Sequence, residues 1–223
     1  MQKPISDTQA PLNDAMNARR QTQILLLFAT LLFCAISFFL LDRPLTLYFH
    51  QFDHGLWHRV WKAVTRAGQS EWYLVGGLLL FAVFRKRNRR ISSTGLLLFS
   101  TVAVSGLTAD LIKVILCRAR PKLFLQQGVY GFDFFGWHLE HAWQSFPSGH
   151  SATALSVALS LSLLYPRFRP AFLAGAMLIA ASRVVLCQHY LSDVVAGSAL
   201  GAVTVALLYQ RYFRTAFDET TIR

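Results

Sequence analysis

Long apolar runs separated by short polar segments dominate the amino-acid sequence. Several runs reach the roughly 17–25 residues that an α-helix needs to cross a bilayer, and they contain few polar residues at the spacing of a surface helix. We interpret six of them as membrane spans, at residues 22–41, 69–84, 94–116, 150–165, 171–188 and 192–210. The pattern predicts an all-α, polytopic membrane protein built as a six-transmembrane-helix bundle. The ends of the runs at 69–84 and 150–165 are the least defined.

The segments outside these runs predict two tails around one membrane domain. Residues 1–21 are polar and predict a flexible cytoplasmic tail. Residues 22–210 would form the membrane domain, and residues 211–223 a short cytoplasmic C-terminal tail. Residues 43–68 carry aromatic side chains between the first two runs, which predicts an amphipathic helix in this loop at the membrane interface.

The positions of the Lys and Arg residues orient the bundle. Six spans put both termini on one side of the membrane, together with the turns at 85–91 and 166–170. That side carries 13 of the 22 basic residues: Lys3, Arg19, Arg20, Arg85, Lys86, Arg87, Arg89, Arg90, Arg167, Arg169, Arg211, Arg214 and Arg223. Five of them crowd into the turn at 85–91, and positive charge in a short loop marks the cytoplasmic side. We therefore expect both termini in the cytoplasm.

The first apolar run is predicted to stay in the mature protein. It is too long for the core of a signal peptide and lacks a small-x-small cleavage site. We expect it to anchor the chain in the inner (cytoplasmic) membrane.

Composition agrees with a membrane protein, with 54% hydrophobic residues, 18 Phe and only 15% charged residues. The net charge of +11 is explained by the orientation and by phosphate binding, and no nucleic-acid-binding motif is present. Cys117 and Cys187 both fall near the outer face, and the sequence leaves open whether they form a disulfide. Gly197 and Gly201, four residues apart in the last run, predict close helix packing.

Lys113 and Arg120, followed by Pro121, form the first of three polar motifs. The two cations are seven residues apart, two turns of an α-helix, and share a face if the helix persists. Pro121 disfavours a helix at Arg120, which suits a chain that leaves the membrane there. Taken alone, the pair is more typical of interfacial cations that snorkel to the headgroups. Asp110 is the expected charge partner of Lys113.

Pro147-Ser148-Gly149-His150 stands where the fourth run begins. Ser148 is suited to cap a helix, and Gly149 lets a ligand approach the backbone closely. The first turn of a helix presents unpaired N–H groups that favour an anion, and His150 would lie beside that anion. The same residue types also occur at ordinary helix starts.

Arg183, His189 and Asp193 form the third motif, at the junction of the last two runs. His189 and Asp193 are four residues apart, so the carboxylate would orient the imidazole through Nδ1. Nε2 would then be unprotonated, as a nucleophilic histidine requires. His-x3-Asp alone is also typical of a buried hydrogen-bonded pair, but three ionisable residues at the end of an apolar helix indicate a functional site.

The three motifs, in this order, resemble the signature of the type 2 phosphatidic acid phosphatase superfamily. The resemblance implies a phosphohistidine on His189, with Asp193 holding its tautomer and His150 protonating the leaving group. It also implies a cage of donors for the phosphate oxygens, without a metal ion or another cofactor. These donors would be Lys113, Arg120, Ser148, the Gly149 backbone N–H and Arg183.

The predicted topology brings the motifs to one face, on the periplasmic side, because apolar runs ending near Lys113 and His189 both point outward. A site at the surface of an apolar bundle is placed to receive a lipid headgroup. We therefore expect an integral membrane lipid phosphatase whose partners are a phosphorylated lipid and the bilayer. Candidate substrates are undecaprenyl pyrophosphate, phosphatidylglycerophosphate, phosphatidic acid and lipid A. The sequence gives no indication of an oligomeric state.

Two alternative activities use similar residues. A phosphotransferase would pass the phosphoryl group to a second lipid instead of to water, and the motifs do not separate the two reactions. A vanadate-dependent haloperoxidase would use a similar cage, but six membrane spans argue against that activity. The 117–149 loop predicts an interfacial gate or anchor because it is rich in aromatic residues: Phe124, Tyr130, Phe132, Phe134, Phe135, Trp137 and Trp143.

Overall fold

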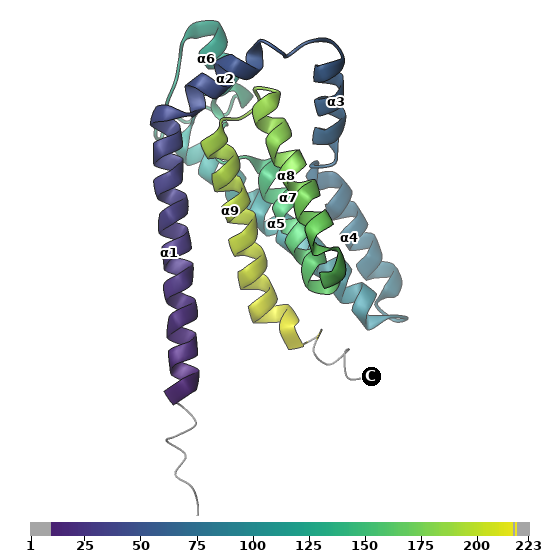
Figure 1. The fold of residues 1–223 in the computed structure, drawn as a ribbon. Helices are drawn as coiled ribbons and strands as arrows, with labels where there is room; N and C mark the ends of the chain where they lie inside the picture. The colour runs from purple at the N-terminus through teal and green to yellow at the C-terminus, as the bar shows by residue number, and fades with distance from the viewer. Residues whose placement is uncertain (1–9, 216, 218–223) are drawn as a thin grey trace, which may run out of the picture.

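The computed structural model describes residues 10–215 and 217, and these are arranged as a bundle of helices (Figure 1). The long helices are α1 (Ala10–Leu40), α4 (Ser70–Phe84), α5 (Arg89–Leu116), α7 (Gly149–Leu164), α8 (Arg169–Val185) and α9 (Leu191–Leu208). The short elements are α2 (Asp42–His50), α3 (Gly55–Arg66), α6 (Pro121–Gln127), the 3-10 turns η2 (His141–Trp143) and η3 (Pro166–Phe168), and the π-helical turn η4 (Tyr209–Phe213). The predicted all-α class is confirmed.

Five helical segments among the described residues are long and apolar enough to cross a bilayer. They are Arg20–Leu40, Gly55–Phe84, Arg89–Leu116, Pro166–Val185 and Leu191–Phe213. α7 corresponds to the predicted run at 150–165 and is apolar, but with 16 residues it is shorter than these five. The structure therefore supports a polytopic bundle with five spans by length, and a sixth span at α7 stays a prediction.

The helices extend beyond the predicted membrane domain at both ends. α1 begins at Ala10, within the predicted tail of residues 1–21, and residues 1–9 lie outside the described part. At the other end, Phe213 and Phe217 are buried against Leu97 and Leu164. This part of the predicted C-terminal tail therefore packs on α5 and α7.

α7 lies at the centre of the bundle, where it packs against α5, α8 and α9. Its buried side chains are mostly Ser, Ala and Thr, which let neighbouring helices come close. A Cβ added at Gly197 would overlap the carbonyl oxygen of Ser148, and one at Gly201 would overlap that of Ala152. The predicted close packing at the two glycines is confirmed, and it joins α9 to the start of α7.

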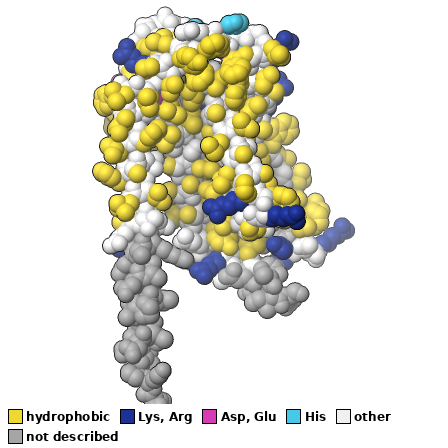
Figure 2. Space-filling view, in the orientation of Figure 1, with side chains coloured by type: hydrophobic (Ala, Val, Ile, Leu, Met, Phe, Trp, Pro, Cys, Tyr) yellow, Lys and Arg dark blue, Asp and Glu magenta, His cyan; other side chains and the backbone are white. Residues whose placement is uncertain are grey.

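The outer surface of the bundle is apolar over its middle and basic near one end. Figure 2 shows hydrophobic side chains over the middle of the visible face, many of the Lys and Arg side chains toward the lower end, and others at the upper end. On α1, Ile24, Leu25 and Phe28 each expose more than half of their surface. The start of α1 and the end of α9 lie at the basic end, and α2, α3 and α6 lie at the opposite end (Figure 1).

Candidate active site

The three polar motifs meet at the end of the bundle that carries α2, α3 and α6 (Figure 1). Helix ends and one loop supply them, which is why residues far apart in the sequence come together. The contributions are Lys113 from α5, Arg120 from the start of α6, Ser148, Gly149 and His150 from the start of α7, Arg183 from α8, His189 from the α8–α9 loop, and Asp193 from α9.

The imidazole of His189 is fixed by a backbone carbonyl. Its Nδ1 lies 2.7 Å from the Ser145 carbonyl oxygen and 3.6 Å from Asp193 Oδ2. A carbonyl oxygen only accepts, so Nδ1 carries the hydrogen and Nε2 of the neutral ring has the lone pair. The expected contact from Asp193 to Nδ1 is longer than the hydrogen bond to the Ser145 carbonyl. Sequence reasoning missed Ser145. Burial and Arg120 lower the pKa of His189 to about 3, so the ring is neutral at physiological pH.

Asp193 supports this arrangement from the first turn of α9. Its Oδ2 accepts hydrogen bonds from the Ser145 hydroxyl at 2.5 Å and from the Tyr190 backbone N–H at 2.9 Å. Its Oδ1 pairs with the guanidinium of Arg118. Because Ser145 is the residue whose carbonyl holds His189, Asp193 positions the imidazole mainly through Ser145.

Arg120 and Arg183 are buried cations held by neutral oxygens. Arg120 donates to the carbonyls of Gln144 at 3.0 Å and Gln188 at 3.3 Å, and Arg183 donates to the Thr65 hydroxyl at 2.7 Å. They are 7% and 8% exposed, and neither forms an ion pair with a carboxylate in the part of the chain that the structure describes. The Nε of each is buried without a hydrogen-bond partner. Two such cations together favour an anion between them.

Lys113 is the third cation, and it is already partly neutralised. Its Nζ lies 2.7 Å from Asp110 Oδ1, which confirms the expected partner. A Cβ added at Gly149 would lie 3.5 Å from the same Nζ, so the ammonium group faces the start of α7. The lysine therefore reaches the position where the first turn of α7 presents its N–H groups.

The start of α7 has the form that the second motif predicts. Ser148 is the N-cap, and its hydroxyl accepts from the Ser151 backbone N–H at 3.4 Å and from the Ser151 hydroxyl at 2.9 Å. The Ser148 N–H donates to the carbonyl of Asp193 at 2.9 Å, which ties α7 to α9. His150 is half-buried and lies against Gly68, before α4. All three motif segments are thus linked by direct contacts.

Comparisons with known proteins identify the family of this chain. A family profile described as the PAP2 superfamily matches residues 94–216, more than half of the chain and the part that holds all three motifs. The chain belongs to the PAP2 superfamily. Two similar proteins are named lipid A 1-phosphatase. The one from Rhizobium etli is 37% identical over 163 residues, 66% of this chain and 69% of the relative. The one from Rhizobium johnstonii is 39% identical over 151 residues, 62% of this chain and 61% of the relative.

Solved structures show the same fold. The transmembrane PAP2-type phosphatidylglycerolphosphate phosphatase from Bacillus subtilis matches with a TM-score of 0.63 at 23% identity, over 89% of this chain and 96% of that one. Aquifex aeolicus LpxE matches with a TM-score of 0.57 at 19% identity, over 76% and 95% of the two chains. With its family, its relatives and its apolar helices, this PAP2 protein is a membrane phosphatase that hydrolyses phosphoric esters of lipids.

Arg118 is a central residue of this PAP2 protein that sequence reasoning missed. It is fully buried, and its guanidinium pairs with Asp193 and, at 2.7 Å, with Asp42 Oδ2. Asp42 also accepts from the Ser192 backbone N–H and hydroxyl. The arginine therefore joins the start of α2 to the start of α9. In the sequence, Arg118 looks like one more interfacial cation, and only Arg120 fits the spacing of the motif.

Aromatic rings enclose this buried arginine. Rings within 6.0 Å of the Arg118 guanidinium carbon belong to Phe38, Tyr130, Phe132, Phe146 and Tyr190. Phe134, Phe135 and Trp137, further along the 117–149 loop, are instead 60–68% exposed. The aromatic-rich loop thus has a packed part that covers Arg118, and an exposed part for which the role of gate or anchor stays a prediction.

The cysteines are all free thiols: Cys34, Cys117 and Cys187. Cys117 and Cys187 both have left-handed backbone geometry, with φ of 43° and 49°, where the chain turns after α5 and α8. The pair left open by the sequence is not a disulfide in this structure.

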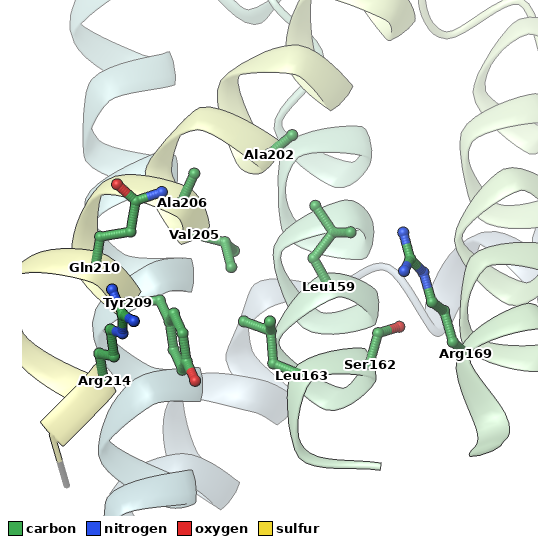
Figure 3. Close-up of a pocket in the computed structure, with 10 residues that line it drawn as sticks. All are labelled: Leu159, Ser162, Leu163, Arg169, Ala202, Val205, Ala206, Tyr209, Gln210 and Arg214. Carbon is green, nitrogen blue, oxygen red and sulfur yellow. The ribbon is translucent and has the colours of Figure 1, made fainter. Parts of the chain in front are cut away.

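Two cavities differ in their relation to the site. The one in Figure 3 has a volume of about 400 Å³ and lies among α7, α8 and α9 with Arg169 and Arg214 at its edge. It contains no motif residue and belongs to the basic end of the bundle. The second, of about 370 Å³, includes Arg120 and Gln188 in its wall and adjoins the motif residues.

Proposed function

We propose that this PAP2 protein removes the 1-phosphate of lipid A through a phosphohistidine on His189, without a metal ion. The substrate is supported by the two relatives named lipid A 1-phosphatase, at 37% and 39% identity. One observation carries the chemistry. Arg120 and Arg183 are buried without a carboxylate partner among the described residues, and both lie close enough to lower the pKa of His189.

The proposed reaction has two displacements at phosphorus. In the first, the His189 Nε2 lone pair forms a P–N bond while the P–O bond to the lipid breaks, and His150 gives its proton to the departing oxygen. In the second, water forms a new P–O bond while the P–N bond breaks, and His150 takes the proton from the water. One water is consumed, and one phosphate and one lipid hydroxyl are released.

The cations act on the charge that the phosphorus centre carries through both steps. Arg120 and Arg183 would each hold equatorial oxygens through their planar forks. Lys113 and the Gly149 N–H would hold the remaining oxygen at the start of α7. Because these donors are held in place before the substrate arrives, little reorganisation is needed in the transition state. Burial lowers the pKa of Arg120 only to about 10, so it stays charged at neutral pH.

The proposed site faces the periplasm, with both chain ends in the cytoplasm of the inner membrane. Support comes from the distribution of basic residues in the described chain. Arg85, Lys86 and Arg87 lie between α4 and α5, at the end of the bundle opposite to the motifs. This end also carries the start of α8 and the end of α9, with Arg169 and Arg214. Positive charge of this kind favours the cytoplasmic side.

The test is phosphate release by the purified protein in detergent from lipid A, phosphatidylglycerophosphate, phosphatidic acid and undecaprenyl pyrophosphate. We expect lipid A to be the best substrate by kcat/KM, with activity retained after dialysis against EDTA. His189→Ala should lower the rate at least about 10³-fold, because it removes the bond-forming atom. His50→Ala, at an exposed histidine of α2, is the matched control and should have no effect.

Three results would overturn parts of this proposal. A lipid other than lipid A with the highest kcat/KM would replace the substrate. Activity lost on chelation and restored by magnesium would replace the metal-independent mechanism. A His189→Ala protein with near-normal turnover would remove the nucleophile.

A further inference from the structure

The cavity of about 370 Å³ beside Arg120 lies within the range of about 300–1,000 Å³ that is typical of small-molecule sites. α6, η2 and the α8–α9 loop supply its walls. Its polar lining residues include Arg120, Lys122, Gln126, Gln127, His141 and Gln188. Of the proposed phosphate-binding residues, only Arg120 is among the lining residues of this cavity.

Primary amides dominate the polar lining of this cavity. Three glutamines, Gln126, Gln127 and Gln188, face one cavity, and no carboxylate is among its lining residues. A primary amide both donates and accepts hydrogen bonds, as the hydroxyl and amide groups of a sugar do. Gln188 is held by a 3.3 Å bond from its Nε2 to the Leu186 carbonyl, which leaves Oε1 as an acceptor.

His141 adds a further neutral hydrogen-bonding group. Burial, followed by the charges of Arg120 and Lys113, lowers the pKa of His141. The lowered pKa favours the neutral ring, which presents one donor and one acceptor. Lys122 is the exposed cation at the same cavity. The cavity wall thus carries more neutral hydrogen-bonding side chains than cationic ones, whereas a bare phosphate would favour cations.

The cavity and the cage share a wall. Arg120 lines the cavity and belongs to the cage, and its Nη1 donates to the carbonyl of Gln188, another lining residue. A group directly attached to a phosphate held by Arg120 would enter this space. A glycerol unit offers few hydroxyl groups to three amides and an imidazole, whereas a sugar ring offers a matching set.

We propose that the cavity formed by α6, η2 and the α8–α9 loop binds the sugar ring that carries the scissile phosphate, and so selects glycolipid phosphates over glycerolipid phosphates. The inference rests on the proposed function and deepens it. Gln126 and Gln127 are its specificity-determining residues, because both are exposed on α6 and line the cavity.

The test compares two soluble phosphates that share the phosphate and differ in what carries it. Glucosamine 1-phosphate and glycerol 3-phosphate are titrated against the full-length His189→Ala protein in detergent, which should bind them without turnover. Their inhibition constants against lipid hydrolysis by the wild type give a second, independent readout. We expect glucosamine 1-phosphate to bind at least about tenfold more tightly, as the loss of two net hydrogen bonds would predict.

Substitutions in the cavity wall test whether it causes the preference for glucosamine 1-phosphate. Gln126→Ala combined with Gln127→Ala should bring the two affinities to within about twofold of each other. Gln51→Ala, at an exposed glutamine at the end of α2, should keep the tenfold preference. Equal affinities in the wild type, or a preference that survives the double substitution, would overturn the sugar subsite.

The outcomes separate this inference from the proposed function. If lipid A is hydrolysed best but the two soluble phosphates bind equally, only the sugar subsite fails. If lipid A is not hydrolysed but glucosamine 1-phosphate is preferred through Gln126 and Gln127, the subsite stands and another glycolipid phosphate must be the substrate.

Discussion

A backbone carbonyl, rather than a carboxylate, sets the tautomer of the proposed nucleophile. The Ser145 carbonyl accepts from His189 Nδ1 at 2.7 Å and cannot exchange its role with the ring. A carboxylate partner could take up a proton at low pH and release the ring, whereas a carbonyl oxygen does not titrate. The tautomer is therefore secured independently of the protonation of Asp193.

The pH dependence of His189 follows from its surroundings. Burial and Arg120 lower the pKa of its imidazole to about 3, so the neutral form needed for attack persists as pH falls from 7 towards 4. Titration of labelled histidine by NMR should show that His189 stays largely neutral over that range. Arg120→Gln removes a nearby positive charge and should raise the pKa. Arg59→Gln, at an exposed position of α3, is the control. A wild-type transition near pH 6.5 would contradict the prediction.

Arg118 should be essential for both stability and turnover. Arg118→Met leaves the buried carboxylates of Asp42 and Asp193 without their shared cation, which should cost about 3–5 kcal/mol. Adding Asp42→Asn should recover part of that loss, because one uncompensated charge is removed. Thermal unfolding of the wild type, the two single variants and the double variant gives the free energies of this double-mutant cycle. We expect kcat to fall in Arg118→Met, because Asp193 loses the cation that holds it in place.

Arg43→Met is the matched control for this cycle. Arg43 is also an arginine beside aromatic rings, those of Phe124 and Tyr130, but it is exposed and lies at the start of α2. We expect a change in stability below about 1 kcal/mol. Additive effects of Arg118→Met and Asp42→Asn would show that the two side chains do not act as one network.

At this scale the sequence predicted residue types better than their contacts. The motif spacing predicted Lys113, Arg120 and His189 as site residues, and the structure places all three at helix ends or in the loop between α8 and α9. It could not identify Arg118 and Asp42, since the two residues are 76 positions apart and meet only when α2 folds over α9. Ser145 was equally hidden, because its contact to His189 uses a backbone carbonyl that every residue possesses.

Among the helices, the contact between α7 and α9 holds the second and third motifs together. Gly197→Ala would push its new methyl group into the Ser148 carbonyl, and Gly201→Ala would do the same at Ala152. We expect each substitution to destabilise the protein by about 1–3 kcal/mol. Gly197→Ala should also lower kcat, because Ser148 is bonded to Asp193.

Gly175→Ala separates packing from helix propensity in this comparison. Gly175 lies in α8 with nothing near a new Cβ, so alanine should stabilise the helix by about 0.5–1 kcal/mol. Thermal unfolding of Gly175→Ala, Gly197→Ala and Gly201→Ala measures the three changes in stability. If Gly197→Ala were as stable as Gly175→Ala, the close approach of α9 to α7 would be incorrect.

The helices themselves were well predicted where length and apolar character coincide. α5, α8 and α9 overlap the expected runs, because a bilayer demands long apolar segments whatever their packing. α1 begins earlier than expected, since polar residues can continue a helix beyond the membrane. η4 extends α9 because Phe213 packs against Leu97 and Leu164. α3 and α4 form one apolar segment where the sequence suggested a loop helix followed by a span.

For the whole molecule, we expect an orientation in the membrane that puts the phosphate site on the periplasmic side. In a background with Cys34, Cys117 and Cys187 replaced by serine, single cysteines are introduced as Gln127→Cys or Asn88→Cys. A membrane-impermeant thiol reagent added to intact cells should label the variant at position 127, at the end of α6, and leave the one at position 88, before α5, unlabelled. The reverse pattern would put the phosphate site in the cytoplasm. An unchanged thermal unfolding transition in detergent is the control that each variant is folded.

α7 also determines how deep the chemistry lies. Its 16 residues rise only about 24 Å, whereas the hydrocarbon core of a bilayer is about 30 Å thick. If the other end of α7 reaches the cytoplasmic headgroups, His150 lies several ångströms below the opposite headgroups. The lipid phosphate must then sink into the protein, and water must follow it downward. A thicker bilayer would lengthen both descents, so membrane thickness becomes a kinetic variable of this enzyme.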